Sequence, residues 1–108
     1  MKQFTNGEYN CKLGQTAKEN WQLFEDANPL YYFFHLSSFP SGYVILETTE
    51  DINESIVLWA AEICKSGTKY RNLKNLKVDY CRCNNLMKSF QVGEVVFRSS
   101  KKIKNIII

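Results

Sequence analysis

The segment from residue 31 to residue 46 constrains the fold of this chain more than any other segment. Its sequence, YYFFHLSSFPSGYVIL, consists of two apolar runs separated by a short stretch that contains Pro40 and Gly42. Aromatic and β-branched runs of this length are typical of strands, and proline and glycine mark turns. The segment therefore predicts two strands, at residues 31–36 and 43–48, joined by a tight turn.

Patterns before this segment predict a hairpin and a helix. Asn6-Gly7 is a strong two-residue turn signal between Lys2–Thr5 and Glu8–Leu13. Thr16 and Glu19 have the spacing of a capping box, in which each side chain accepts a hydrogen bond from a backbone N–H at the start of a helix. We therefore expect a first helix to begin near residue 17.

Patterns after the segment predict a second helix and three more strands. Apolar residues recur at helical spacing from Ile52 to Cys64. Glu50, Asp51 and Asn53 offer N-cap chemistry for this helix, and Gly67 provides a stop signal. Strands are expected at about 76–83, 92–98 and 102–108, with the last two joined by a turn at 99–101. This order predicts an α+β fold: one domain over residues 1–108, with a mixed sheet of about six or seven strands and two main helices packed on it.

The composition sets broad limits on the class of protein. A chain of 108 residues with 44% hydrophobic content has the length for one modest core. No run approaches the roughly 20 apolar residues that span a bilayer, and the first residues lack the apolar stretch of a secretory signal. The four cysteines lack the spacing of a zinc site. We therefore expect a cytoplasmic protein with reduced thiols, no structural disulfide, no metal, no cofactor and no membrane association.

The net charge of +3 conceals an uneven distribution of charge along the chain. Residues 1–64 contain three Lys and nine acidic residues, for a net charge of −6. Residues 65–108 contain eleven Lys and Arg and two acidic residues, for a net charge of +9. Such segregation favours a polyanionic partner. The alternative is a solvated surface on which the two halves offset each other.

His35 is the only histidine, and we expect no enzymatic role for it. Hydrolytic or transfer chemistry needs a nucleophile and an orienting acid beside the histidine, and the neighbouring sequence supplies no acid. Phosphate-binding loops, dinucleotide motifs, carboxylate pairs and metal-ligand clusters are also absent from the sequence. Strand alternation places His35 on the same face as Tyr31 and Phe33. We expect this face to be the exposed one, where His35 either supports the turn or contacts RNA.

The central segment and five others, taken in order over about residues 8–108, resemble the RNA-binding (R) domain of NFACT proteins. The central segment is similar to the family pattern Asp-x-Trp-Phe-His, linker, Pro-Gly-Ser-His-Val-Ile-Leu. Tyr31, Phe33 and Tyr43 stand at the Asp, Trp and second His positions, and the Gly-Ser of the turn is reversed. The other similar segments are Gly14/Ala17/Asn20, Ala60-Ala61, Val78–Cys81, Gly93–Phe97 and Lys101–Ile103. The matching positions expected to shape the fold are Gly14, Asn20, Pro40, Gly42 and Gly93.

The resemblance implies a stand-alone R-like domain that binds tRNA or ribosomal RNA through a basic surface. Larger members of the family engage the ribosome and tRNA in ribosome-associated quality control. The candidate RNA contacts are Lys18, His35, Lys69, Arg71, Lys74, Arg82, Lys88 and Arg98. Two alternatives stay open: a non-catalytic module that docks on ribosomes or another complex without RNA affinity, and a DNA-binding relative. A contiguous positive face that contains His35 would favour nucleic acid, and scattered lysines would favour protein docking.

Overall fold

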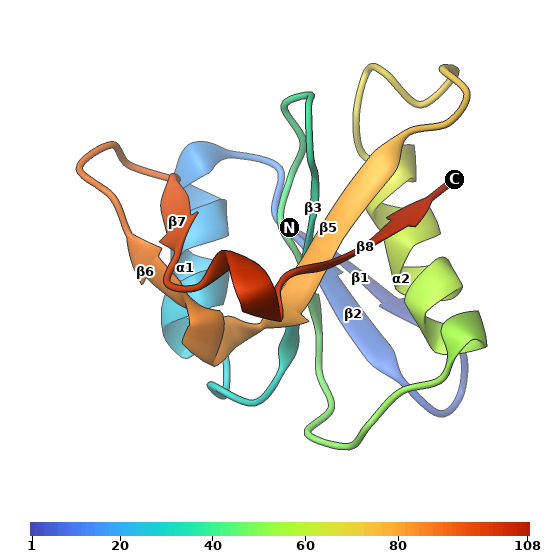
Figure 1. Ribbon diagram of the computed structural model, residues 1–108, viewed down its shortest axis with the longest axis horizontal. Helices are drawn as coiled ribbons and strands as arrows, with labels where there is room; N and C mark the ends of the chain where they lie inside the picture. Colours follow the sequence, from blue (N-terminus) through green and yellow to red (C-terminus); the bar gives the residue numbers. More distant parts are fainter.

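The predicted strand pair of the 31–46 segment lies at the centre of the main sheet in the computed structural model, which describes all residues 1–108 (Figure 1). These two strands are β3 (Tyr32–Leu36) and β4 (Val44–Leu46). The helices are α1 (Ala17–Asp26) and α2 (Glu54–Ser66). The remaining elements are β1 (Lys2–Thr5), β2 (Asn10–Leu13), β5 (Lys77–Arg82), η1 (Cys83–Asn85), β6 (Leu86–Lys88), β7 (Val95–Phe97), η2 (Ser100–Lys102) and β8 (Lys104–Ile107). The α+β fold class predicted from the sequence is confirmed.

The main sheet has six strands in the order β1-β2-β4-β3-β5-β8, and every neighbouring pair is antiparallel. The sequence predicts a mixed sheet, and the structure corrects this to an antiparallel one. The reason is topological: α1 connects β2 to β3 and α2 connects β4 to β5, and in each case the connected strands run parallel. Because β4 lies between the first pair and β3 between the second, no two parallel strands are neighbours.

The two helices cover opposite faces of the sheet (Figure 1). α2 packs on the face that carries Tyr32, Phe34 and Leu36, whereas α1 and the β6–β7 hairpin pack on the face of Phe33. The expectation of an exposed face is therefore wrong for Phe33, whose side chain is 1% exposed. Strands covered on both faces have near-continuous apolar sequences, which explains the absence of polar alternation in β3. The second face opens only around His35.

The capping residues set the helix boundaries as predicted. Thr16 Oγ1 accepts a hydrogen bond from Glu19 N at 3.1 Å, and Glu19 Oε1 accepts one from Gln15 N at 2.9 Å. Asn53 Oδ1 accepts a bond of 3.0 Å from a backbone N–H in the first turn of α2, and the helix ends at its C-cap Gly67. These local hydrogen bonds satisfy donors that have no partner within a helix.

The predicted pairing of the last two strands is wrong. β7 pairs with β6 in a separate two-stranded sheet, and β8 pairs with β5 at the edge of the main sheet. The chain is diverted because the buried Asn85 side chain binds both backbone groups of Ser99. Asn85 Nδ2 donates to Ser99 O and Ser99 N donates to Asn85 Oδ1, each at 3.0 Å. The freed β6–β7 hairpin covers the sheet beside α1.

Gly42 brings the turn after β3 into contact with the end of β2. A Cβ atom on Gly42 would lie 2.0 Å from the backbone oxygen of Gly14, which is far inside van der Waals contact. The next residue is held at the same place, because Gly14 N donates to Tyr43 O at 2.9 Å and Tyr43 N donates to Asn20 Oδ1 at 3.1 Å. Glycine is therefore required at position 42 by the close backbone approach and not by a positive φ.

Gly42→Ala is expected to lower the free energy of unfolding by about 2–3 kcal/mol, because the added methyl group must push two backbone segments apart. Ser38→Ala, at an exposed position of the same turn, is the control and should change it by less than about 0.5 kcal/mol. Urea unfolding followed by circular dichroism measures both variants. Equal unfolding midpoints for the two would contradict the close approach.

Candidate functional site

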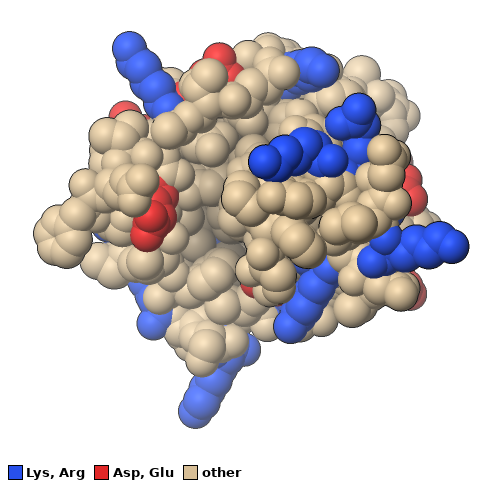
Figure 2. Space-filling model, turned by 90° about the horizontal axis from the view of Figure 1, so that it is seen from above, with Lys and Arg blue, Asp and Glu red and all other residues tan.

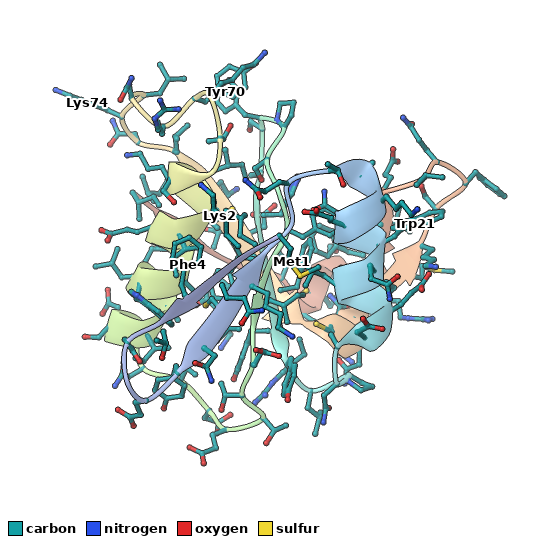
Figure 3. All side chains as sticks on the ribbon, turned by 180° about the vertical axis from the view of Figure 1, so that it is seen from behind. Met1, Lys2, Phe4, Trp21, Tyr70 and Lys74 are labelled. Atoms are coloured by element: carbon teal, nitrogen blue, oxygen red, sulfur yellow. The ribbon has the colours of Figure 1, made fainter.

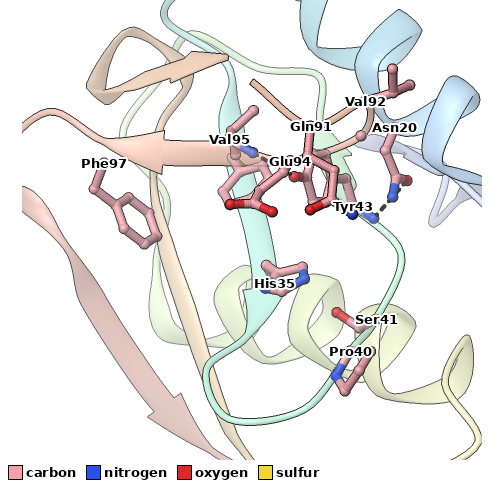
Figure 4. Close-up of a pocket in the computed structure, with 12 residues that line it drawn as sticks. Asn20, His35, Pro40, Ser41, Tyr43, Gln91, Val92, Glu94, Val95 and Phe97 are labelled. Carbon is pink, nitrogen blue, oxygen red and sulfur yellow. Dashed lines mark hydrogen bonds between the residues drawn. The ribbon is translucent and has the colours of Figure 1, made fainter. Parts of the chain in front are cut away.

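Two adjoining hollows open at the end of the sheet where β3 ends and α1 begins. The first, called the His35 cleft, has a volume of about 290 Å³ and is lined by Asn20, Phe33, His35, Pro40, Ser41, Tyr43, residues 91–95 and Phe97 (Figure 4). The second, called the glycine groove, has a volume of about 410 Å³ and lies between residues 15–17, 40–42 and 67–69. Asn20, Pro40, Ser41 and Gly93 line both hollows, so the two form one depression.

The five positions of the structural motif gather at this depression. Gly42 and Gly14 are in contact at its floor, and Asn20 and Pro40 line both hollows. Gly93 packs on α1, where a Cβ would lie 2.5 Å from the Cβ of Ala17, and its φ of +85° favours glycine. These residues therefore shape the depression by close packing of backbone segments.

Asn20 also presents a polar group to the depression. Its Oδ1 is used by the fold, since it accepts the bond from Tyr43 N. Its Nδ2 has no hydrogen-bond partner within the protein, and the residue, although 9% exposed, lines both hollows. Asn20 therefore offers a hydrogen-bond donor to a ligand without any rearrangement of the fold.

His35 lies half-buried in the wall of the cleft. Its ring stacks on Phe33 at a centroid distance of 6.1 Å and meets the Tyr43 ring edge-on at 5.4 Å. Within the same turn, Ser41 Oγ accepts a hydrogen bond from Leu36 N at 3.1 Å. Burial lowers the pKa of His35 below its ordinary value, and nearby backbone groups and a carboxylate oppose this only in part. His35 is therefore neutral at physiological pH and supplies an aromatic surface rather than a positive charge.

Tyr43 and Glu94 face His35 across the cleft (Figure 4). Tyr43 Oη accepts a hydrogen bond from Val95 N at 3.0 Å, which joins the β6–β7 hairpin to the main sheet. Burial raises the pKa of Tyr43, so its hydroxyl keeps its proton and can donate. The Glu94 side chain is exposed and takes part in none of the ion pairs of the protein.

Four of the eight candidate RNA contacts lie at the start of α1 or in the loop that follows α2. Lys69 lines the glycine groove, and Lys18 follows Ala17 at the edge of the groove. Arg71 and Lys74 belong to the loop between α2 and β5, and Figure 3 shows Lys74 at the tip of this loop. All four are exposed, and none belongs to an ion pair.

Arg82 lies at the opposite end of β5 and is held by the fold. Its Nη1 donates to Leu30 O at 2.6 Å and to Thr49 O at 2.9 Å, and its Nη2 donates to Asp51 Oδ1 at 3.1 Å. The guanidinium also lies 4.1 Å from the centroid of the Tyr32 ring. Arg82 therefore ties two loops to the sheet, away from the other basic candidates.

Lys88 and Arg98 lie on the β6–β7 side of the molecule and also have partners. Lys88 Nζ forms an ion pair with the Glu25 carboxylate and lies 4.5 Å from the centroid of the Trp21 ring. Arg98 Nε donates to Leu86 O at 3.2 Å. The structure therefore places His35 and Lys69 at the depression and Lys18 next to the groove residue Ala17. Arg71 and Lys74 lie farther along the loop after α2, and Arg82, Lys88 and Arg98 lie on other elements.

The basic side chains do not merge into one continuous face. Figure 2 shows the end of the molecule that bears the depression, with Lys and Arg side chains standing apart around it and uncharged surface between them. An acidic side chain borders the hollow. The positively charged side chains on this end of the molecule are thus separated from one another, and the depression between them is lined by aromatic residues.

The buried thiols are not reactive groups. Burial raises the pKa of Cys11 and Cys83 to about 12 and the pKa of Cys64 and Cys81 to about 11, so all four are protonated at neutral pH. No group of three or more His, Cys, Asp or Glu side chains is placed to hold a metal ion. Neither helix has the length and apolar composition needed to cross a bilayer.

The sequence gives no sign that Glu94, Val95 and Phe97 belong to the site, since it assigns them to a strand of the main sheet. They reach the cleft because β7 leaves that sheet. The available signal is the turn glycine Gly93 directly before a charged residue in an otherwise apolar stretch. That signal indicates a bend in the chain, but not which surface the bend faces.

Arg82→Ala is expected to lower the free energy of unfolding by about 1–2 kcal/mol, because two carbonyl oxygens lose a charged donor. Asp51→Asn is the control: the Asp51 side chain is fully exposed, so loss of this ion pair should leave the urea midpoint unchanged. Both variants are measured by urea unfolding. If Arg82→Ala matches the wild type, Arg82 is an ordinary surface residue.

Stability is expected to fall as the pH drops below the ordinary histidine pKa of 6.5, because the unfolded chain binds a proton that folded His35 resists. His35→Gln removes this dependence. The difference in free energy of unfolding between wild type and variant should therefore shrink as the pH is lowered from about 7.5 to about 5. The contribution of the carboxylates to the pH dependence is expected to be the same in both proteins, so it cancels in the difference between them. A difference that stays constant over this range would show that His35 is not desolvated.

Comparison with known proteins finds no matching family model and no matching curated protein. Among solved structures, the C-terminal part of the fibronectin/fibrinogen-binding protein from Streptococcus suis is similar, with a TM-score of 0.85 and 22% sequence identity. The match covers 96% of this chain and 42% of that chain, so this chain spans less than half the length of the streptococcal one. The likeness establishes that the two share a fold.

Proposed function

We propose that this chain is an RNA-binding domain related to the R domain of NFACT proteins, and that it contacts tRNA or ribosomal RNA with the end of the sheet that bears the depression. The observation that carries the proposal is the set of basic side chains around that depression without carboxylate partners: Lys18, Lys69, Arg71 and Lys74. No carboxylate neutralises these four charges, and Arg71 makes one bond within its own loop, to Thr68 O at 3.3 Å. Arg82, in contrast, is bound to two carbonyl oxygens and to Asp51.

The start of α1 supports an anionic partner in the same place. Thr16 and Ala17 line the glycine groove, and the first N–H groups of a helix have no partner within it. The positive end of the helix dipole adds to the charge of Lys18. The groove therefore offers backbone donors beside lysine side chains, the combination that commonly holds a phosphate.

The proposed contacts with phosphates are individually weak and carry no sequence preference of their own. Separate charges around a depression contact phosphates at separate points, so affinity should depend strongly on salt. The proposal includes a cytoplasmic location, association with ribosomes and the absence of catalysis. The last point agrees with four thiols that stay protonated at neutral pH.

A second candidate function is docking on another protein. Its specific observation is the tip of the β6–β7 hairpin, where Phe90 is fully exposed and Val92 is 56% exposed. Exposed aromatic side chains are common anchors of protein interfaces. The dispersed basic charge of Figure 2 also fits this candidate. The streptococcal protein is named for binding fibronectin and fibrinogen, so these two proteins serve as probes.

The wild-type protein is expected to bind a labelled tRNA with micromolar dissociation constants, and with affinity that falls steeply between about 50 and 200 mM salt. The triple variant Lys69→Glu/Arg71→Glu/Lys74→Glu should reduce affinity at least about tenfold, because contacts with two or three phosphates become repulsive. Fluorescence anisotropy measures both. Absence of binding by the wild type at the lowest salt would sink the proposal.

The matched control is Lys101→Glu/Lys102→Glu/Lys104→Glu, which makes the same charge change on exposed residues of η2 and β8. Its affinity for tRNA should stay within about threefold of the wild type, since the change in net charge alone has a small effect. Equal losses for the two triple variants would mean that no particular surface binds RNA. Binding of fibronectin or fibrinogen that is abolished by Phe90→Ser, without RNA binding, would favour the docking candidate.

A further inference from the structure

The His35 cleft has the walls of a site for a single flat ring system. Phe33 forms edge-to-face pairs with Tyr43 and Phe97 at centroid distances of 4.8 and 6.4 Å, and His35 stacks on Phe33 at 6.1 Å. The cleft volume of about 290 Å³ lies at the lower limit of the roughly 300–1,000 Å³ typical of small-molecule pockets. The cleft therefore suits one heterocyclic ring better than a larger ligand.

Polar groups of both kinds converge on this aromatic space. Asn20 Nδ2 has no partner within the protein, and the Tyr43 hydroxyl accepts a bond from Val95 N while its own proton is free to donate. The Glu94 carboxylate is an acceptor directed into the same space (Figure 4). A ligand with both donors and acceptors around an aromatic ring would be complementary to this arrangement.

A carboxylate such as that of Glu94 is not expected beside a surface that binds phosphates. Glu94 is one of two acidic residues in the basic half of the chain, residues 65–108, and the other, Asp79, lies within the sheet opposite His35 on β3. The Glu94 side chain belongs to none of the ion pairs of the protein. A free carboxylate beside a phosphate-binding surface weakens phosphate binding by repulsion. A hydrogen bond to a donor on the ligand would account for a carboxylate at this place.

Resting on the proposed function, we infer that the His35 cleft holds one unstacked RNA base that carries an exocyclic amino group, and that Glu94 accepts a hydrogen bond from this amino group. Single-stranded RNA presents splayed bases that stack on aromatic and histidine rings. Carboxylates accept hydrogen bonds from the N4 amino group of cytosine. Uracil has a carbonyl oxygen at the same position, which the carboxylate repels. The phosphates beside this base can reach Lys69 and Lys18 at the glycine groove.

The test compares cytosine with uracil, because these two bases have the same size and differ at the position that Glu94 would contact. Affinities for oligo(C) and oligo(U) of equal length are measured by anisotropy for the wild type and for Glu94→Ala. The wild type should prefer oligo(C) about tenfold. Glu94→Ala should lose this preference and bind both strands more tightly than the wild type binds oligo(U), because a negative charge is removed. Glu62→Ala, which removes an exposed carboxylate from α2, should keep the preference.

A second measurement tests whether the base binds in the His35 cleft. In ¹H–¹⁵N spectra of the labelled wild-type protein, cytidine should shift the Asn20 side-chain amide and the Val95 backbone amide more than uridine does. Equal affinity for oligo(C) and oligo(U), or a preference that survives in Glu94→Ala, would overturn the inference and leave the proposed RNA binding in place. Absence of binding to either strand, with no shifts from cytidine, would overturn both.

Discussion

The contact between Gly42 and Gly14 is the constraint on which the rest of the structure depends. The glycines allow the turn after β3 to lie against the end of β2, and both backbone groups of Tyr43 are then bonded, to Gly14 N and to Asn20 Oδ1. β3 and β4 are apolar on both faces, so the alternation that normally fixes strand register is absent. The polar contacts at Tyr43 supply the register instead, and they also fix α1 against the sheet.

The features of the fold that depend on residues close together in the chain could be predicted from the sequence. Thr16 and Asn53 start their helices because the groups that they bond lie three residues ahead in the chain. The departure of β7 from the main sheet could not be predicted in this way. It depends on the contact between Asn85 and Ser99, which is fourteen residues later in the chain. The burial of Phe33 follows from the same event, because the hairpin covers its face.

The candidate site also has features that could be predicted from the sequence and features that could not. The motif residues from Gly14 to Gly93 could be identified in the sequence, since their types and order are visible there. The sequence could not indicate which basic residues are free of partners within the protein. The two carbonyl oxygens that bind Arg82, for example, belong to loops 33 and 52 residues away. The neutrality of His35 is equally a tertiary property, produced by the rings and strands that surround it. A count of basic residues in a sequence therefore overestimates the number of charges that can bind a ligand, because some of them form bonds within the fold.

The interleaved order of the strands has a consequence for the growing chain. β5 is the strand that covers the outer edge of β3, and it comes after α2 in the sequence. While the chain is synthesised from its N-terminus, the aromatic strand β3 thus has one edge without a hydrogen-bonded neighbour until residue 82 has emerged. Open apolar edges pair readily with other chains. The domain is therefore most exposed to aggregation during synthesis, in the interval between completion of α2 and arrival of β5.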